Sequence, residues 1–367
     1  MALGQRIAEA RQRAGLTQAD LAAAVSVDRS AIAKIETAGR RVTALELAQI
    51  ADVVDERIEW FVTDPPPTVV SYRNLHEPGA ANSTIDRIIE RVARNVEFVL
   101  AQDERWSLVA AETLRRPDSG EEAESSAAHV RQTLGLAGQD PALEIARNAE
   151  RLGLLVFSFD LGPDGADAAS ILLPQGGIAV TNGNLRVGRR RLACVHELGH
   201  YVFADPYTVD WRVAEQEDNA AWETRLDRFA RAFLLPGSGL RRYWTEAAHA
   251  DADLRTAAVV AASRFRVDMS TLARRLVELG LASADDAARI RTVRTTKADI
   301  VELGLVVQDE LAAPELPRSY IQAVLRLYRN EIISAARATD LLFDTWTEED
   351  LPPLPPLPDS AIWTFVS

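Results

Sequence analysis

The sequence has a single cysteine, no long apolar run and no excess of positive charge, and each lack excludes a class of protein. Cys194 alone cannot form an internal disulfide framework. No apolar stretch is long enough to span a bilayer, and no charged-then-apolar leader is present. Because the formal net charge is -13, any contact with DNA requires a local basic patch. These features predict a cytoplasmic protein that does not enter a membrane.

What the chain does contain is helical periodicity over most of its length. Its 367 residues, 47% of them hydrophobic, exceed what one core usually organises, so we expect two or three domains. The predicted fold class is mainly α with a small β-sheet (α+β). Five short helices are predicted over 4–14, 17–25, 28–37, 43–53 and 55–61, with Thr17 as the N-cap of the second. Residues 1–62 therefore form a compact helical domain, and the prolines at 65–67 open a linker over 63–83.

A second domain is predicted over residues 84–245. It begins with a long amphipathic helix from 84 to about 113, followed by an acidic surface loop over 118–126. Helices at about 126–135 and 141–152 lead to strands at 154–159, 169–173 and 177–181. A small sheet thus precedes residues 196–200, where two of the five histidines lie.

Beyond this domain we predict a helical C-terminal region over 246–350, with a loop near 312–317, and a proline-rich tail over 351–367 whose residues 362–366 could dock as an edge strand. Residues 259–279 superficially resemble a helix-turn-helix. We interpret that pair as packing against the second domain, and a second DNA-reading unit is the alternative. The helices from 316 to 344 are interpreted as a sensory or oligomerisation appendage.

The N-terminal domain has the layout of a helix-turn-helix, with Ala22, Val27, Ile32 and Ile35 at the helix crossing. Its third helix would present polar side chains to base edges, and neighbouring groups would reach phosphates. Residues 1–41 hold seven Lys or Arg and four Asp or Glu, a local net charge of +3. The predicted DNA-binding residues are Gln18, Arg29, Ser30, Lys34, Arg40 and Arg41.

Residues 4–62 resemble the XRE family of DNA-binding domains, through the LTQADLA segment at 16–22 and the IAKIE segment at 32–36. The resemblance implies the fold and a double-stranded DNA operator. It also implies a homodimer, since such domains usually bind paired half-sites. The alternative is a module of this fold that serves as a protein-contact domain.

The segment HELGH at 196–200 predicts a metal site. On a helix, His196 and His200 stand on one face, four residues apart, so both imidazoles can bind one cation. Glu197 lies one step round the helix, where it can act as general base on a metal-bound water. Zinc is the natural occupant, because two imidazoles and a carboxylate leave a position open for a water whose pKa the metal lowers towards ~7. Another divalent metal would also fit.

The alternative is a coincidence of two surface histidines and a glutamate on one helix. The flanking residues oppose it, because Leu192, Val195, Leu198 and Val202 predict a buried helix in which unpaired imidazoles would be costly. Glu223, on a later helix, offers a third protein ligand.

Here the chain resembles the ImmA/IrrE family of metallopeptidases, marked by a HELGH helix and a later E-x-x-A-N-x-F-A-x-x-L-L-x-P helix. The resemblance covers residues 140–240 and implies a zincin-like fold with His196, His200 and Glu223 as metal ligands and Glu197 as the base. Arg191, five residues before His196, also fits the family pattern.

The sequence departs from that pattern at Leu226 and Asp227, where the family more often has Ala and Asn. Asp227 could orient a ligating imidazole, or it could be a solvated helix residue. No transition-state stabiliser is assigned, since Tyr201 and Tyr207 are near in sequence but core packing explains each. Cys194 is interpreted as a core residue.

The sequence thus predicts a transcriptional regulator with a zinc endopeptidase domain. By the resemblance, it would cleave a specific repressor-type protein, in trans or another copy of this chain, and so control phage, mobile-element or stress genes. The alternative is a DNA-binding repressor or antitoxin-like protein whose peptidase fold binds a partner or senses metal without turnover. The three ligands alone do not separate these hypotheses.

Overall fold

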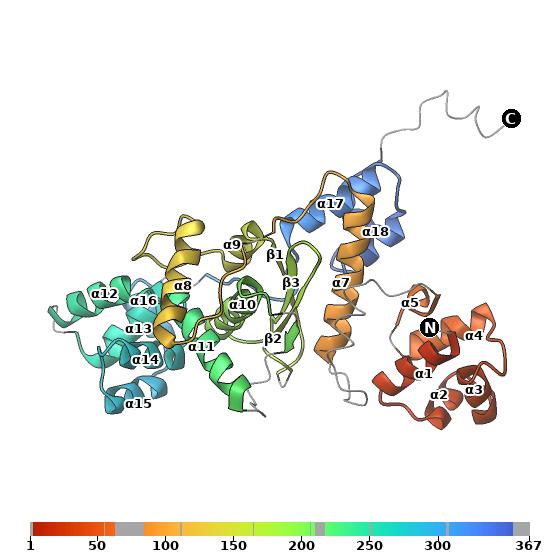
Figure 1. Cartoon of the computed structure of the whole chain (residues 1–367), viewed down its shortest axis with the longest axis horizontal. Helices are drawn as coiled ribbons and strands as arrows, with labels where there is room; N and C mark the ends of the chain where they lie inside the picture. Colours follow the sequence, from red (N-terminus) through yellow and green to blue (C-terminus); the bar gives the residue numbers. More distant parts are fainter. Residues whose placement is uncertain are drawn as a thin grey trace. The chain divides into compact units, whose positions relative to one another are not determined.

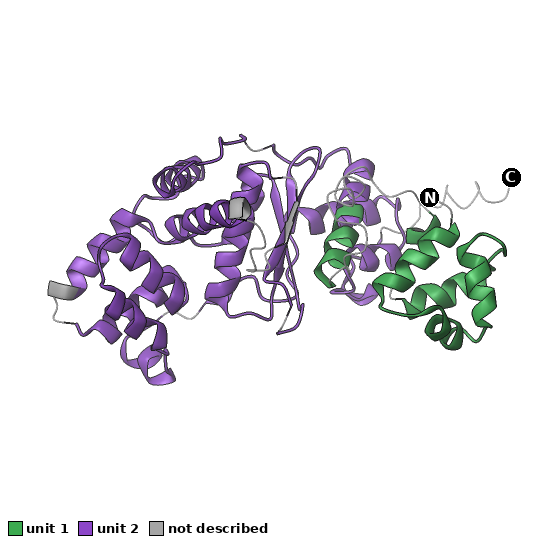
Figure 2. Ribbon diagram, turned by 60° about the horizontal axis from the view of Figure 1, so that its bottom comes forward, with its two compact units in different colours: residues 1–94 green, residues 95–367 purple. Residues whose placement is uncertain are grey.

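A computed structural model describes residues 3–54, 56–62, 84–110, 112–163, 165–205, 207–209, 217–249, 252–305 and 308–354 (Figure 1). The chain divides into two compact units, Met1–Arg94 and Asn95–Ser367, coloured separately in Figure 2. The predicted linker at 63–83, the tail from 355 and its edge strand at 362–366 lie outside the described residues.

Unit 1 contains the predicted helix-turn-helix. Its elements are α1 (Leu3–Arg13), α2 (Gln18–Ala24), α3 (Arg29–Glu36), α4 (Ala44–Val53), α5 (Ile58–Val62) and the first part of α7 (Thr84–Gln102). Thr17 caps α2 in a reciprocal arrangement with Asp20, as Thr43 caps α4 with Glu46. Apolar side chains from all five short helices form one core. The prediction of five helices is confirmed.

A buried polar contact ties α1 to α3 in unit 1. Arg11 Nε lies 2.6 Å from Glu36 Oε1, and Gln18 Nε2 on α2 donates to Glu36 Oε2 at 2.8 Å. Gly4 allows the close crossing, because a Cβ there would lie 2.2 Å from the carbonyl oxygen of Ile35. The first three helices are therefore held in one arrangement, which leaves the outer face of α3 exposed.

Unit 2 is built around a four-stranded mixed sheet in the order β1-β3-β2-β4. The strands are β1 (Leu154–Phe159), β2 (Ala168–Leu172), β3 (Gly177–Asn182) and β4 (Tyr207–Val209). β1 runs parallel to β3, whereas β2 is antiparallel to both β3 and β4. The three predicted strands are confirmed, and together with the helices they confirm the α+β class.

Of the helices of unit 2, two precede the sheet in the chain and the others follow β3 (Figure 1). The helices are α8 (Gly120–Thr133), α9 (Ile145–Arg151), α10 (Val187–Val202), α11 (Glu217–Leu234), α12 (Gly237–His249), α13 (Leu254–Phe265), α14 (Met269–Glu278), α15 (Ala284–Thr292), α16 (Lys297–Glu302), α17 (Arg318–Arg329), α18 (Ala335–Leu341) and a 3-10 turn at Glu348–Asp350. α10 packs on β1, β2 and β3, and α11 packs between α8 and α10. None of the described helices is both long and apolar enough to cross a membrane.

Strand β1 alternates its side chains between two layers, as a pleated strand must. Leu154 and Val156 join the core that contains α10 and α11. Phe157 faces the other way, with its ring centroid 5.3 Å from that of Tyr320 on α17 and 5.9 Å from that of Phe343. The helices predicted as an appendage after residue 316 therefore cover a face of the sheet.

The segment before α17 ties the C-terminal helices to α10. Ser158 and Glu315 pair through both backbone hydrogen bonds at 2.8 and 3.0 Å, which adds an antiparallel bridge beside β1. Glu310 in the same segment pairs with Arg191 on α10. The irregular structure predicted near 312–317 is confirmed, and it is anchored at both ends.

Two predictions upstream of the sheet are wrong. The long helix ends at Gln102 rather than near 113, because Asp103 accepts the backbone N–H of Arg105 at 3.2 Å and turns the chain. Trp106 and Leu108 continue the apolar pattern but are buried in an irregular segment.

The acidic stretch predicted as a loop over 118–126 contains the first two turns of α8. Ser119 is its N-cap and accepts the N–H of Glu122, while Glu121 and Glu122 lie in the first turn, where negative charge is favourable. The Ser-x-x-Glu spacing of 119–122 was the available signal for this helix.

Candidate metal centre

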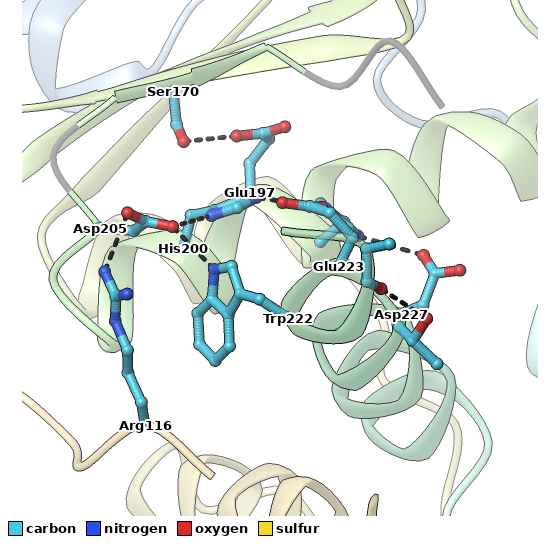
Figure 3. A network of polar contacts seen from close by, with 11 residues as sticks. Arg116, Ser170, Glu197, His200, Asp205, Trp222, Glu223 and Asp227 are labelled. Atoms are coloured by element: carbon cyan, nitrogen blue, oxygen red, sulfur yellow. Dashed lines mark hydrogen bonds and ion pairs between the residues drawn. The ribbon is translucent and has the colours of Figure 1, made fainter. Parts of the chain in front are cut away.

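Three side chains from two helices converge in unit 2. His196 and His200 project from one face of α10, and Glu223 comes from α11. His200 and Glu223 are labelled in Figure 3. The Nε2 atoms of the two imidazoles lie 3.2 Å apart, and Glu223 Oε2 lies 3.0 Å from His196 Nε2 and 3.8 Å from His200 Nε2. The structure therefore brings together all three residues that were predicted as metal ligands.

The spacing of these donors fits one small cation. Donors bound tetrahedrally at about 2.0–2.2 Å stand about 3.4 Å from one another, and the observed separations of 3.0, 3.2 and 3.8 Å bracket that value. Both imidazoles are buried, while the Glu223 side chain is 33% exposed. The donor set is two nitrogens and one oxygen, which suits zinc.

Close packing of α10 against α11 produces this convergence. At Gly199 a Cβ would lie 2.9 Å from Leu226 Cδ2 and 3.2 Å from Phe229 Cδ1. A side chain at this position would have to displace the buried side chains of Leu226 and Phe229, which lie on the same helix as Glu223. The glycine of HELGH thus has a packing role that follows from the structure.

The carboxylate of Glu197 is held by a contact with the sheet. Glu197 is fully buried, and Ser170 on β2 donates a hydrogen bond to its Oε2 (Figure 3). The bond fixes one carboxylate oxygen beneath the sheet. The contact of Ser170 was not predicted, because it depends on the register of β2 and has no local signal in the sequence.

Asp227 contacts the outer nitrogen of His196, with its Oδ1 3.2 Å from Nδ1. Its other oxygen lies 3.3 Å from Arg231 on the next turn of α11. Of the two sequence-based hypotheses for Asp227, the geometry favours a residue that orients the imidazole.

His200 has an equivalent partner that the sequence did not reveal. Its Nδ1 lies 2.9 Å from Asp205 Oδ2, which also accepts the indole N–H of Trp222 at 2.8 Å, and Arg116 donates to Oδ1 at 3.0 Å. Burial raises the pKa of the Asp205 carboxyl, but the hydrogen bond and charge of His200, together with Trp222 and Arg116, hold it below its usual value. Asp205 is therefore charged and faces the back of the imidazole.

Two other residues near the histidines, Cys194 and Tyr201, are structural. Cys194 is fully buried in the core, and burial strongly raises the pKa of its thiol, as expected for a packing residue. The Tyr201 hydroxyl donates to the carbonyl of Leu152 at 2.9 Å, which confirms packing. The side chain of Tyr207 lies outside the described residues.

Arg191 is completely buried one turn before His196. It pairs with Glu310 and donates to the carbonyl of Ala142. Burial lowers the pKa of Arg191, whereas the charge of Glu310 opposes that effect. The arginine that fits the family pattern therefore anchors the metal-binding helix to surrounding segments, away from the cluster.

In unit 1 the predicted DNA-binding residues fall into two groups. Arg29, Ser30, Lys34 and Arg41 are exposed, and the three basic ones form no ion pair with any described residue. Gln18 already donates to Glu36, and Arg40 pairs with Glu46 at 2.6 Å. The outer face of α3 is thus the most available basic surface of this unit.

Comparison with known families agrees with both units. Residues 7–61 match the helix-turn-helix family, and residues 149–277 match the IrrE N-terminal-like domain, which spans α10, α11, α13 and α14. No curated protein and no solved structure gives a significant match. The chain joins an XRE-type DNA-binding helix-turn-helix domain to an IrrE/ImmA-like metallopeptidase domain.

Proposed function

We propose that this DNA-binding regulator is also a zinc-dependent endopeptidase that cleaves a specific repressor-type protein. The convergence of His196, His200 and Glu223 beside the buried carboxylate of Glu197 carries the proposal. Helix packing alone does not require three converging metal-ligating side chains with a buried carboxylate next to them, and burying such polar groups is costly unless they have partners.

Each residue of the cluster has a distinct role in this proposal. His196, His200 and Glu223 hold the zinc ion, with Asp227 and Asp205 orienting the two imidazoles from behind. When bound, zinc supplies Lewis-acid activation of water and of the scissile carbonyl. Glu197 accepts the proton of the attacking water and returns it to the leaving amine. The hydrogen bond from Ser170 keeps the Glu197 carboxylate in place for both transfers.

The attached helix-turn-helix favours a narrow regulatory cut over general peptide digestion. Arg29, Ser30, Lys34 and Arg41 lie on an exposed basic surface, and a double-stranded operator is their proposed partner. Binding to paired half-sites would require a homodimer. The substrate would be another repressor-type protein or a second copy of this chain. Its cleavage would control the expression of phage, mobile-element or stress genes.

A second function is a repressor or antitoxin-like protein that senses metal without cleaving anything. The same contacts support it, because Asp227 at 3.2 Å and Asp205 at 2.9 Å hold both imidazoles for a cation whether or not cleavage follows. Metal sensing and peptide hydrolysis use the same three metal ligands. A substitution of Glu197, which only hydrolysis needs, can therefore distinguish the two functions.

The discriminating variant is Glu197→Gln. We expect it to bind zinc like the wild type, because Glu197 is not among the three converging donors. Loss of the base should lower the cleavage rate by about 10²–10⁴-fold. Zinc content is measured on the purified chain, and cleavage is measured with repressor-type proteins, including a second copy of the chain, as substrates.

The same variant is then introduced into cells and gene induction is compared with the wild type. A Glu223→Gln variant serves as the matched control, because it should lose both zinc and cleavage. If Glu197→Gln cells respond to inducing conditions as the wild type does while Glu223→Gln cells do not, the peptidase proposal fails and metal sensing remains.

A further inference from the structure

Five arginines line a cleft of about 640 Å³ in unit 2. Its walls are the start of α10, the middle of α11, and helices α14 and α15, which are labelled in Figure 1. A volume of this size falls in the range of about 300–1,000 Å³ that is typical of small-molecule sites. The five residues are Arg186, Arg189, Arg231, Arg274 and Arg291.

Two of these arginines are neutralised by the protein. Arg189 makes two hydrogen bonds of 2.7 Å to the carboxylate of Asp167. Arg231 lies 3.3 Å from Asp227 and 2.9 Å from Glu278. Neither guanidinium requires a further counter-charge.

The other three have no such partner. Arg186, Arg274 and Arg291 are exposed and form no ion pair with any described residue. Asp268 also lines the cleft, but its carboxylate accepts the backbone N–H groups of Ser270 and Thr271 at 2.9 Å each, as the N-cap of α14. Three arginines without an ion-pair partner and one carboxylate, Asp268, which has only neutral hydrogen-bond donors, thus face one concave space.

Two other features of the cleft suit an anion. Ser270 places an exposed hydroxyl group at the start of α14, whereas the hydroxyl of Thr271 and the amide of Asn184 already donate to Asp268 and Asp160, at 2.7 Å each. No side chain caps the N-terminus of α10, which begins after Arg186. The positive end of that helix dipole adds to the attraction for an anion.

We propose that this cleft binds a small molecule that carries two or more phosphoryl groups. Guanidinium groups bind phosphoryl oxygens through paired, charge-assisted hydrogen bonds, and three of them together match a multiply charged anion. A volume of about 640 Å³ matches a small molecule and is too small to enclose duplex DNA. The cleft also borders the metal centre, because Asp227 lines it and contacts His196 Nδ1.

Calorimetric titration of the full-length, metal-free chain with inorganic triphosphate tests this proposal. Metal is removed because triphosphate chelates zinc, and binding to the cleft does not require the peptidase function. We expect saturable binding with one triphosphate per chain. The double variant Arg274→Ala, Arg291→Ala should weaken it about 100-fold, since each lost charge-assisted contact weakens binding by about tenfold.

The matched control is Arg264→Ala, Arg289→Ala, which removes the same charge from exposed positions on α13 and α15 that do not line the cleft. It should retain wild-type affinity, and circular dichroism checks that both variants are folded. Absence of binding by the wild type overturns the proposal, as does equal weakening in the two double variants. Displacement of triphosphate by a random-sequence DNA duplex would assign the arginines to a nucleic-acid surface instead.

Discussion

Asp205 offers the sharpest test of how the second histidine is held. One carboxylate oxygen accepts hydrogen bonds from the imidazole of His200 and the indole of Trp222, at 2.9 and 2.8 Å. The other oxygen accepts a hydrogen bond from Arg116 at 3.0 Å. In Asp205→Asn, the amide oxygen can keep the first two contacts, but the NH₂ group then faces the guanidinium of Arg116. Asp205→Ala removes all three contacts.

The expected magnitudes follow from these contacts. Losing the partner of a metal-binding histidine typically weakens metal affinity by about 10–100-fold. Asp205→Asn keeps the hydrogen-bond acceptor for His200 but loses the negative charge, which makes the imidazole a stronger ligand for the metal. We therefore expect about tenfold weaker zinc binding. Asp205→Ala leaves the Nδ1–H of a histidine that is 1% exposed without its acceptor, so we expect about 100-fold.

Competition against a chelating indicator measures both zinc affinities on the full-length chain. Arg116→Ala is the control, because its side chain is 52% exposed and such surface ion pairs contribute at most about 1 kcal/mol. The reasoning is refuted if Asp205→Ala binds zinc as tightly as Arg116→Ala does.

Three further perturbations test other parts of the structure. Gly199→Ala places a methyl group against the side chains of α11, so the free energy of unfolding in urea should fall by about 1–3 kcal/mol and zinc affinity should fall with it. The guanidinium of Arg275 lowers the pKa of Glu124 from 4.5 to about 2, so its charged form stabilises the fold above about pH 4.5, and this stability is lost as the pH falls towards 2. In Glu124→Gln that part of the acid dependence, about 1–2 kcal/mol after solvent screening, should disappear. Finally, Arg29→Ala with Lys34→Ala should weaken operator binding and reduce the slope of log affinity against log salt by about 2.

Each of these has a matched control. Gly138→Ala should be neutral, because a Cβ there has no atom within 4 Å, and equal effects at Gly199 and Gly138 would contradict the packing argument. Glu121→Gln, an exposed position on the same helix as Glu124, should leave acid unfolding nearly unchanged. Arg289→Ala with Lys297→Ala removes the same charge from unit 2, and an unchanged salt slope in the α3 variant would refute the placement of that helix on DNA.

Local sequence signals were sufficient for the elements whose determinants are local. Strand β1 follows from a run of six residues after Gly153 that are apolar except for Ser158, and α2 follows from the cap at Thr17. The helix α7 was extended too far because Trp106 and Leu108 are apolar, although the interactions that bury them are tertiary. The start of α8 was placed too late, at about 126, because the small and acidic residues before it were weighed as composition rather than as an N-terminal cap.

The candidate metal centre divides in the same way. His196, His200 and Glu223 lie at helical spacings that a motif can specify, because each helix presents its ligands by periodicity alone. The contact of Ser170 with Glu197 joins a strand to a helix 27 residues later and depends on sheet register. No spacing rule in the sequence connects those two residues.

Asp205 is more instructive, because it lies only five residues after His200 and was still not found. The helix ends in a turn in which Ala204 adopts a left-handed conformation, with φ of 53°, and the backbone N–H of Asp205 donates to the carbonyl of His200 at 2.9 Å. This turn folds the chain back, so that the Asp205 carboxylate reaches the imidazole of the same residue. Glycine is the residue that usually indicates such a left-handed helix end, and an alanine at this position does not indicate one. A backbone turn therefore brings Asp205 to His200, and Ala204 is not a residue type from which that turn could be predicted. Asp227, the partner of His196, lies on a regular helix, so its position could be predicted from helical spacing.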